Sequence, residues 1–263
     1  MNMSRKASAR AVGSPTARPA LASDFAGRGV AAFGEAMAEM DLPMTKEALE
    51  TVAAWFRFYS NWPGRRVIGF GDPREAAIKL IADSFAVARL APGLPPGGAV
   101  DLGSGNGWPG LAVRLLRPSS PVVLLDSRLG ACEFMRGFVE RSAFSGVSVV
   151  EARAEDAWKD PGIAGRFSLA VSRAMASPAI SLEVASSFLP VGGAVVLWLG
   201  PEQASIVDRS SDIRELGLSR YGGLQYDLPG GLGRRVLAVY AKVSPSLPGY
   251  PRKIPAIKAK PLL

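Results

Sequence analysis

The chain has 263 residues, 48% of them hydrophobic, which is enough for one α/β domain with extra elements or two small domains. It contains no histidine, which excludes histidine-based acid–base catalysis, Ser-His-Asp triads and most zinc sites. The net charge is +8, the one cysteine excludes an internal disulfide, and no apolar run reaches the ~18 residues of a membrane span. We therefore expect a soluble, metal-free protein of a reducing compartment, the cytoplasm.

The excess positive charge lies at the two ends of the chain. Residues 1–23 carry four basic residues and no acidic one, and residues 228–263 carry seven and none. We expect a disordered basic tail over 1–23 and a basic tail over 244–263. Such ends suit a polyanionic partner, because each cation that meets a phosphate releases counterions. A merely solubilising role is the alternative, and the composition of 1–23 also suits, less well, an organellar transit peptide.

Residues 24–96 are expected to form an N-terminal helical region. Apolar residues repeat at helical spacing from Leu49 to Tyr59, and the helix is broken at 61–64. Asp72 followed by a proline reads as an N-cap, which opens a second helix that runs to Leu90.

From 97 to 243, short apolar runs alternate with helical stretches. Several of the runs are apolar at consecutive positions, which indicates strands buried on both faces of a parallel sheet. The alternation predicts a doubly wound α/β domain. The expected strands are 99–102, 122–125, 147–150, 167–171, 194–199 and a last strand at 236–240, and the expected helices are 108–116, 128–143, 179–189 and one near 203–216. No regular element is expected in the last twenty residues.

A glycine-rich loop, 101–110, follows the first of these strands and opens a helix. Its glycines let the backbone approach a ligand closely, and the helix N-terminus then faces an anion. The spacing also fits a dinucleotide fingerprint. However, Asp101 precedes the glycines, where it would repel a pyrophosphate but suit the ammonium group of S-adenosylmethionine. Asp126, after the second strand, can accept both ribose hydroxyls. Glu155 and Asp156, after the third, are placed to meet the adenine amine.

Several motifs, in order, resemble those of the bacterial small-subunit rRNA guanine-N(7) methyltransferases, also called the glucose-inhibited division protein B family. The resemblance covers about 50–263. It is carried by Asp83-Ser84-Phe85, the loop Asp101 to Gly110 with its unusual proline, Leu124-Leu125-Asp126-Ser127, Arg153-Ala154-Glu155-Asp156, Ser172-Arg173-Ala174-Met175-Ala176, Tyr250-Pro251-Arg252-Lys253 and Pro261-Leu262. It implies a class I methyltransferase (Rossmann-like) α/β fold with N-terminal helices and a mostly parallel sheet whose last strand is antiparallel.

The resemblance also implies a methyl donor, a partner and a site. The donor would be S-adenosyl-L-methionine and the partner the 16S rRNA of the small ribosomal subunit, with a monomer favoured. Arg173 is the candidate catalytic residue, with a salt bridge to a neighbouring acid as its alternative role. Trp108 and Trp198 could stack on a base or pack in the core. The residues expected to bind the cofactor are Asp101, Gly103, Ser104, Gly105, Gly107, Trp108, Asp126, Ser127, Ala154, Glu155 and Arg173.

Departures from the family pattern leave alternatives open. The family's histidine before Asp-Ser falls on Leu80, its Lys-Arg on Gly130 and Ala131, and a further lysine on Leu199. A diverged paralogue with another substrate, or a non-catalytic RNA-binding protein on the same fold, therefore remains an alternative. Guanine N(7) has no proton to lose, so its methylation needs no general base, in agreement with the histidine-free sequence.

Overall fold

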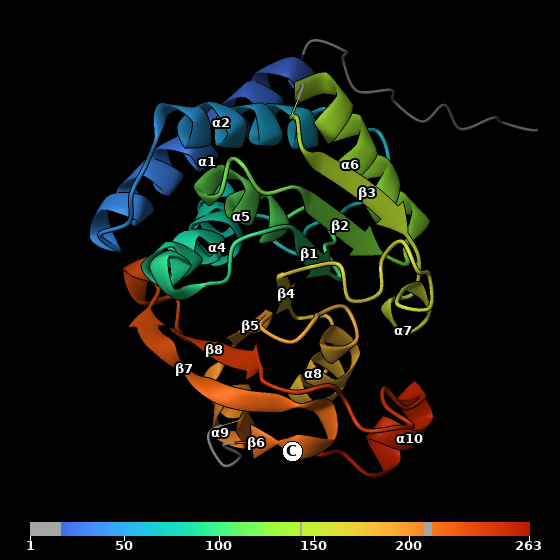
Figure 1. The fold of residues 1–263 in the computed structure, drawn as a ribbon. Helices are drawn as coiled ribbons and strands as arrows, with labels where there is room; N and C mark the ends of the chain where they lie inside the picture. The colour runs from blue at the N-terminus through green and yellow to red at the C-terminus, as the bar shows by residue number, and fades with distance from the viewer. Residues whose placement is uncertain (1–16, 143, 208–211) are drawn as a thin grey trace, which may run out of the picture.

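An eight-stranded mixed sheet forms the centre of the protein (Figure 1). The computed structural model describes residues 17–142, 144–207 and 212–263. The strands run in the spatial order β3-β2-β1-β4-β5-β8-β7-β6. Their bounds are β1 Ala99–Leu102, β2 Val122–Asp126, β3 Val147–Glu151, β4 Leu169–Arg173, β5 Ala194–Leu199, β6 Asp212–Ile213, β7 Leu218–Asp227 and β8 Arg234–Lys242.

Strands β1 to β5 are parallel, and β8 pairs with β5 in the antiparallel direction. Every residue of β1 and of β5 is buried, as expected of strands covered on both faces. The chain order reverses between β1 and β4, where a doubly wound sheet opens a crevice at the carboxyl ends of its strands. The predicted class I methyltransferase fold, with its mostly parallel sheet and antiparallel last strand, is confirmed.

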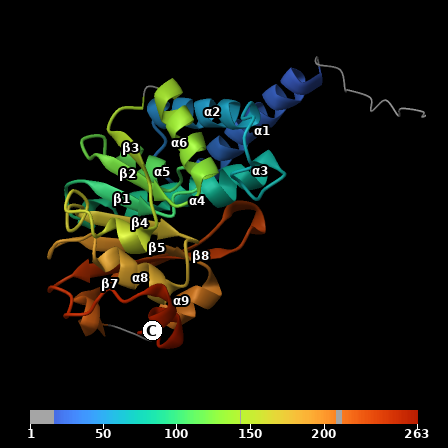
Figure 2. The same ribbon diagram turned by 90° about the vertical axis from the view of Figure 1, so that its right-hand side faces the viewer.

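Helices cover both faces of the sheet (Figure 2). Their bounds are α1 Ala17–Glu39, α2 Lys46–Ser60, α3 Pro73–Ala76, η1 Ala77–Ala82, α4 Asp83–Phe85, η2 Ala86–Arg89, η3 Ala91–Gly93, α5 Gly110–Leu116, α6 Leu129–Ser142, α7 Ala154–Ala157, α8 Pro178–Ser186, α9 Pro201–Val207, η4 Arg214–Leu216, η5 Pro229–Gly231 and α10 Ile254–Ala259. On one face, α1, α2, α5 and α6 pack around buried aromatic residues such as Trp55 and Phe134. On the other, α8, α9 and α10 pack around Phe188 and Tyr240.

Two of the N-terminal helices begin at capping residues, of which the Asp72–Pro73 start was predicted. Thr45 caps α2 by accepting a hydrogen bond from the backbone N–H of Ala48, at 3.1 Å. The Asp72 side chain accepts one from Arg74 N, at 3.0 Å, and Pro73 occupies the first helical position. From there the chain stays helical through α3, η1, α4 and η2, so the second helix lies against the sheet as one continuous element.

Four segments differ from the prediction. The helix expected near 203–216 ends at Val207, and the chain then forms the short strand β6 and the turn η4, with 208–211 outside the described residues. The ten-residue strand β7 was not predicted, and α10 lies in a segment expected to be irregular. Helix α1 begins at Ala17, inside the segment 1–23 expected to be disordered, of which 1–16 lie outside the described part.

Candidate active site

The glycine loop joins β1 to α5 at the carboxyl edge of the sheet. At Gly103 the backbone is left-handed, with φ 74°, and a Cβ atom there would lie 2.8 Å from Cγ of Met175. At Gly110 a Cβ atom would lie 2.3 Å from Cδ2 of Leu124. No other residue fits these two positions without moving a neighbour, so the loop backbone lies directly against the strands.

Asp101 lies beneath this loop and is fully buried. Its Oδ2 accepts a hydrogen bond from the N–H of Gly110, at 2.8 Å, whereas its Oδ1 is buried without a hydrogen-bond partner in the described structure. Burial raises the pKa of the Asp101 carboxyl to about 7. A buried carboxylate oxygen with no donor is costly, so this atom is suited to a cationic donor brought by a ligand.

Asp126 ends β2 on the opposite side of the loop. Its two carboxylate oxygens accept backbone hydrogen bonds of 2.9 Å each, Oδ2 from the N–H of Gly105 and Oδ1 from the N–H of Arg128. The Arg128 guanidinium adds two longer bonds to the same carboxylate. Asp126 therefore ties the glycine loop to the end of β2 and is itself held in one orientation.

A cavity of about 480 Å³ opens beside Asp126. Its walls come from the first residues after β1, β2, β3 and β4, and from α10. The residues that line it are Gly103, Leu125, Asp126, Ser127, Arg128, Ala152, Arg153, Ala154, Glu155, Ala174, Met175, Ala176, Ile180, Val184, Ile254 and Lys258. The cavity thus combines one buried carboxylate, backbone from four strand ends and apolar side chains, the usual make-up of a small-molecule site.

The structure divides the expected site residues into two groups. Gly103, Asp126, Ser127, Ala154 and Glu155 line the cavity, whereas the others are not among its lining residues. The latter are Asp101, Ser104, Gly105, Gly107, Trp108 and Arg173.

Two expected contacts of that second group have internal partners instead. Ser104 Oγ donates to the carbonyl of Asp101, at 2.8 Å, and Trp108 is buried against Trp55 and Phe85. Asp156, expected beside Glu155 at the adenine amine, is exposed and pairs with Lys159 at 2.5 Å. None of these three side chains is part of the cavity surface.

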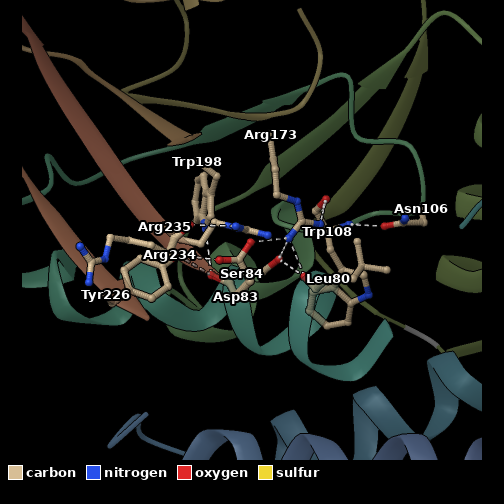
Figure 3. Close-up of polar contacts among 10 residues, drawn as sticks. All are labelled: Leu80, Asp83, Ser84, Asn106, Trp108, Arg173, Trp198, Tyr226, Arg234 and Arg235. Carbon is tan, nitrogen blue, oxygen red and sulfur yellow. Dashed lines mark hydrogen bonds and ion pairs between the residues drawn. The ribbon is translucent and has the colours of Figure 1, made fainter. Parts of the chain in front are cut away.

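Arg173, the expected catalytic residue, lies in a buried polar cluster (Figure 3). One guanidinium nitrogen donates to the carbonyl of Leu80 at 2.6 Å and to Ser84 Oγ at 2.9 Å, and it lies 3.4 Å from Asp83 Oδ2. The other donates to the carbonyl of Trp108, at 3.1 Å. The geometry favours the alternative role, because Arg173 forms a salt bridge with Asp83 of α4 and a hydrogen bond to the glycine loop at Trp108.

The same cluster explains Trp198. Its indole N–H donates to the carbonyl of Asp83, at 2.9 Å, and Tyr226 Oη donates to Asp83 Oδ1, at 2.6 Å. Both tryptophans considered for base stacking, Trp108 and Trp198, are buried, with 2% and 3% of their surface exposed. Core packing is therefore the role of each in this structure.

The sequence reasoning missed two walls of the cavity. The turn after β4 contributes Ala174, whose φ of 55° is unusual for a residue with a side chain, and Met175, which packs on Gly103. The C-terminal segment contributes Ile254 and Lys258. The residues Ser172–Ala176 stood in a recognised motif, but only Arg173 among them was assigned to the site.

The C-terminal segment is folded back rather than free. Arg252 pairs with Glu183 of α8 at 2.7 Å, and Glu183 is fully buried. Arg252 also donates to the carbonyl of Lys260, at 2.9 Å, and Ile257 is fully buried. The expectation that Arg252 reaches out to phosphate therefore differs from its contacts here. Lys253, by contrast, is exposed.

Comparison with known proteins identifies the family. A family model described as rRNA small subunit methyltransferase G matches residues 64–211, more than half of the chain. The chain belongs to this family. The rRNA small subunit methyltransferase G of Carboxydothermus hydrogenoformans is 29% identical over 229 residues, 86% of this chain and 96% of the relative. That of Desulfitobacterium hafniense is 30% identical over 193 residues, 73% and 80% of the two chains. The family resemblance inferred from the motifs is confirmed.

Solved structures extend the likeness to the fold alone. The ribosomal protein L11 methylase of Lactobacillus delbrueckii subsp. bulgaricus superposes with a TM-score of 0.50 at 15% identity, covering 66% of this chain and 81% of that one. Within residues 17–142, 144–207 and 212–263, no cluster of three or more His, Cys, Asp or Glu side chains could hold a metal ion. Over the same ranges, no helix combines the length and hydropathy needed to cross a membrane.

The positions at which this member of the rRNA small subunit methyltransferase G family departs from the motifs are mostly buried. Leu80, Ala131 and Leu199 are 7%, 4% and 4% exposed, so apolar side chains suit their surroundings. Gly130 is partly exposed at the start of α6, and a Cβ atom there would lie 3.8 Å from Cβ of Arg65. Arg65, from the loop after α2, thus lies beside Gly130, where the family pattern has a basic residue.

Proposed function

We propose that this protein is an S-adenosylmethionine-dependent methyltransferase that acts on guanine N(7) of 16S ribosomal RNA. The observation that carries the proposal is the pairing of two buried carboxylates on either side of the glycine loop, Asp101 below it and Asp126 beside the cavity, in a chain of the rRNA small subunit methyltransferase G family. The name of the relatives suggests small-subunit rRNA as the substrate, and the motif resemblance suggests guanine N(7) as the methylated atom.

The residues present fit this cofactor. The partnerless Oδ1 of Asp101 is a suitable acceptor for the aminoacyl ammonium, and Asp126 for the ribose hydroxyls. Ala154 and Glu155, which also line the cavity, suit the adenine ring and its amine. S-adenosylmethionine supplies a methyl group on a positively charged sulfur, ready for direct attack. We infer that the chain binds the cofactor through these four residues.

In the transfer step, the role of this protein is to position the guanine relative to the methyl group. Guanine N(7) carries an in-plane lone pair and no proton, so no side chain has to accept one. The protein must hold the nucleophile in line with the methyl group, and the resulting effective molarity supplies most of the rate. The bonds of Arg173 to Leu80 and Trp108 hold the glycine loop against the helix, so we assign Arg173 a positioning role.

One experiment tests the proposal directly. The protein is incubated with methyl-labelled cofactor and ribosomes from cells that lack this modification, and the rRNA is then treated with borohydride and aniline, which cut at N(7)-methylguanine. We expect one cut in the small-subunit rRNA, dependent on enzyme and cofactor, and none with Asp126→Ala. Label transfer without an aniline-sensitive guanine would reject the N(7) assignment and favour another substrate. Cofactor binding without any transfer would favour the non-catalytic alternative.

The pH dependence is a second readout of the same chemistry. With cofactor saturating, single-turnover rates should stay nearly flat from about pH 6 to 9, because no general base titrates in the transfer step. An alkaline rise would indicate a nucleophile that must lose a proton, such as an exocyclic amine.

A further inference from the structure

The side chain of Arg128 lies inside the cofactor cavity. Its guanidinium donates to both oxygens of Asp126, from Nε to Oδ1 at 3.2 Å and from Nη2 to Oδ2 at 3.3 Å. A Cβ atom at Gly105 would lie 3.2 Å from the same Nη2, so the guanidinium also covers the glycine loop. Arg128 therefore lies against both the loop and the acid, where the ribose is expected.

The Arg128 side chain occupies hydrogen-bond acceptor sites of Asp126 that a ribose would need. An ionised carboxylate offers about four lone-pair sites, two on each oxygen. Backbone N–H groups of Gly105 and Arg128 take one site on each oxygen, and the Arg128 guanidinium takes the other. A ribose diol needs one site on each oxygen. It can therefore bind Asp126 without disturbing the loop only if the Arg128 side chain leaves.

Moving the Arg128 side chain away from Asp126 should cost little free energy. Its side chain is 67% exposed, and Asp126 is the one hydrogen-bond partner of its guanidinium within the described residues. The guanidinium is already mostly solvated, so its own cost of leaving is small, and the ribose hydroxyls would replace its bonds to the buried Asp126 carboxylate. The backbone bonds to Asp126 do not depend on the guanidinium and stay in place.

The freed guanidinium would be close to a second exposed arginine. Arg65, in the loop after α2, lies near Gly130, since a Cβ atom built at Gly130 would be 3.8 Å from Cβ of Arg65, and both Arg65 and Arg128 are exposed. Leu129, between Arg128 and Gly130, is 57% exposed. No ion pair of Arg65 occurs in the part of the chain that the structure describes. Once the ribose occupies Asp126, two exposed arginines without a carboxylate partner are left near the start of α6, a pattern that suits a backbone phosphate of RNA.

We propose that Arg128 blocks the ribose site of Asp126 until the cofactor displaces it, and that the displaced guanidinium then joins Arg65 in binding an RNA phosphate. This inference rests on the proposed function, because it assumes the cofactor and the RNA. By linkage, a cofactor that releases Arg128 raises the affinity for RNA, and RNA raises the affinity for the cofactor by the same factor.

The test compares the full-length protein with Arg128→Met, using S-adenosylhomocysteine as a non-reactive ligand and a transcript of small-subunit rRNA. Calorimetry should show the variant binding S-adenosylhomocysteine about two- to fivefold more tightly, the range that corresponds to one exposed ion pair. In wild type, RNA should bind about two- to fivefold more tightly with S-adenosylhomocysteine present, and this ratio should fall to one in the variant. Arg65→Met should weaken RNA binding in both states and leave cofactor affinity unchanged.

Arg136→Met is the matched control, since Arg136 also lies on α6 and pairs with an exposed carboxylate, Glu151, at 3.1 Å. It should match wild type in every measurement. Weaker cofactor binding by Arg128→Met would show that Arg128 holds the cofactor, and an unchanged RNA ratio would show that it does not couple the two ligands. Either result overturns the inference alone. Failure of the wild-type protein to bind S-adenosylhomocysteine at all would overturn the proposed function as well.

Discussion

Replacing Arg173 by methionine should destabilise the fold before it affects chemistry. The Arg173 side chain is 13% exposed and that of Asp83 is 1% exposed, so the substitution leaves a buried carboxylate without its cation. Breaking a buried pair in this way costs ~3–5 kcal/mol. At ~2–4 °C per kcal/mol for a chain of this size, the melting temperature should fall by roughly 6–20 °C.

The loss should depend on pH. Burial raises the pKa of Asp83 above its usual value of 3.8, and Arg173 is the strongest opposing influence. Without Arg173 the pKa rises further, so the folded state binds a proton that the unfolded state has already released. Stability of the variant should therefore fall as pH rises above about 4, and the deficit relative to wild type should be smaller at pH 5 than at pH 8.

Thermal and urea unfolding measure both effects, and Asp83→Asn closes a double-mutant cycle. Adding Asp83→Asn to Arg173→Met removes the buried charge and should recover part of the loss. If Arg173→Met instead melts within about 2 °C of wild type but no longer transfers the methyl group, the salt-bridge role is refuted and a catalytic role is supported.

Two further predictions concern the cavity. Asp101→Asn should weaken S-adenosylmethionine binding by ~1–3 kcal/mol. Because the pKa of Asp101 is raised to about 7, wild-type affinity measured by calorimetry should be lower at pH 6 than at pH 7.5, since the neutral acid cannot pair with the ammonium, and the variant should lack this dependence. Arg252→Met leaves the buried Glu183 carboxylate without its cation and should lower the free energy of unfolding by ~3–5 kcal/mol. Arg252→Met should also weaken cofactor binding, because α10 lines the cavity. Lys253→Met is the control and should change neither stability nor cofactor binding. If Arg252→Met keeps its stability and loses only the salt dependence of RNA binding, the C-terminal segment is instead an unpacked RNA-binding tail.

The sequence was most informative where a pattern is local. Strands with consecutive apolar residues, such as β5, and the Asp72–Pro73 helix start are set by neighbours along the chain, and both were predicted. Strand β7 was missed because its burial is irregular and Gly222 and Gly223 interrupt it, with a register shift between Arg220 and Gly222. Its place in the sheet comes from pairing with β8, which no local pattern reveals.

The site shows the same division. Gly103, Asp126 and Glu155 lie at or shortly after the ends of neighbouring strands, so the fold alone brings them to one cavity. The role of Arg173 depends on Asp83, which is 90 residues away along the chain. The C-terminal wall depends on the contact of Arg252 with Glu183, 69 residues away, and Pro255 within α10 obscures its helical pattern. Partners of this kind are fixed by tertiary packing, and a motif shows one partner without the other.

The aromatic packing around α2 also determines the tryptophan fluorescence and near-ultraviolet circular dichroism expected of the protein. Trp55 stacks on Tyr59 with ring centroids 5.5 Å apart and meets Trp108 edge to face at 6.3 Å, and Trp62 contacts Phe134 at 5.5 Å. Three of the five tryptophans thus belong to one assembly that joins the N-terminal helices to the glycine loop. Indole emission should shift to longer wavelength, and the near-ultraviolet dichroism should collapse, when these helices separate from the sheet, so the docking of the helical region can be followed optically without an added label.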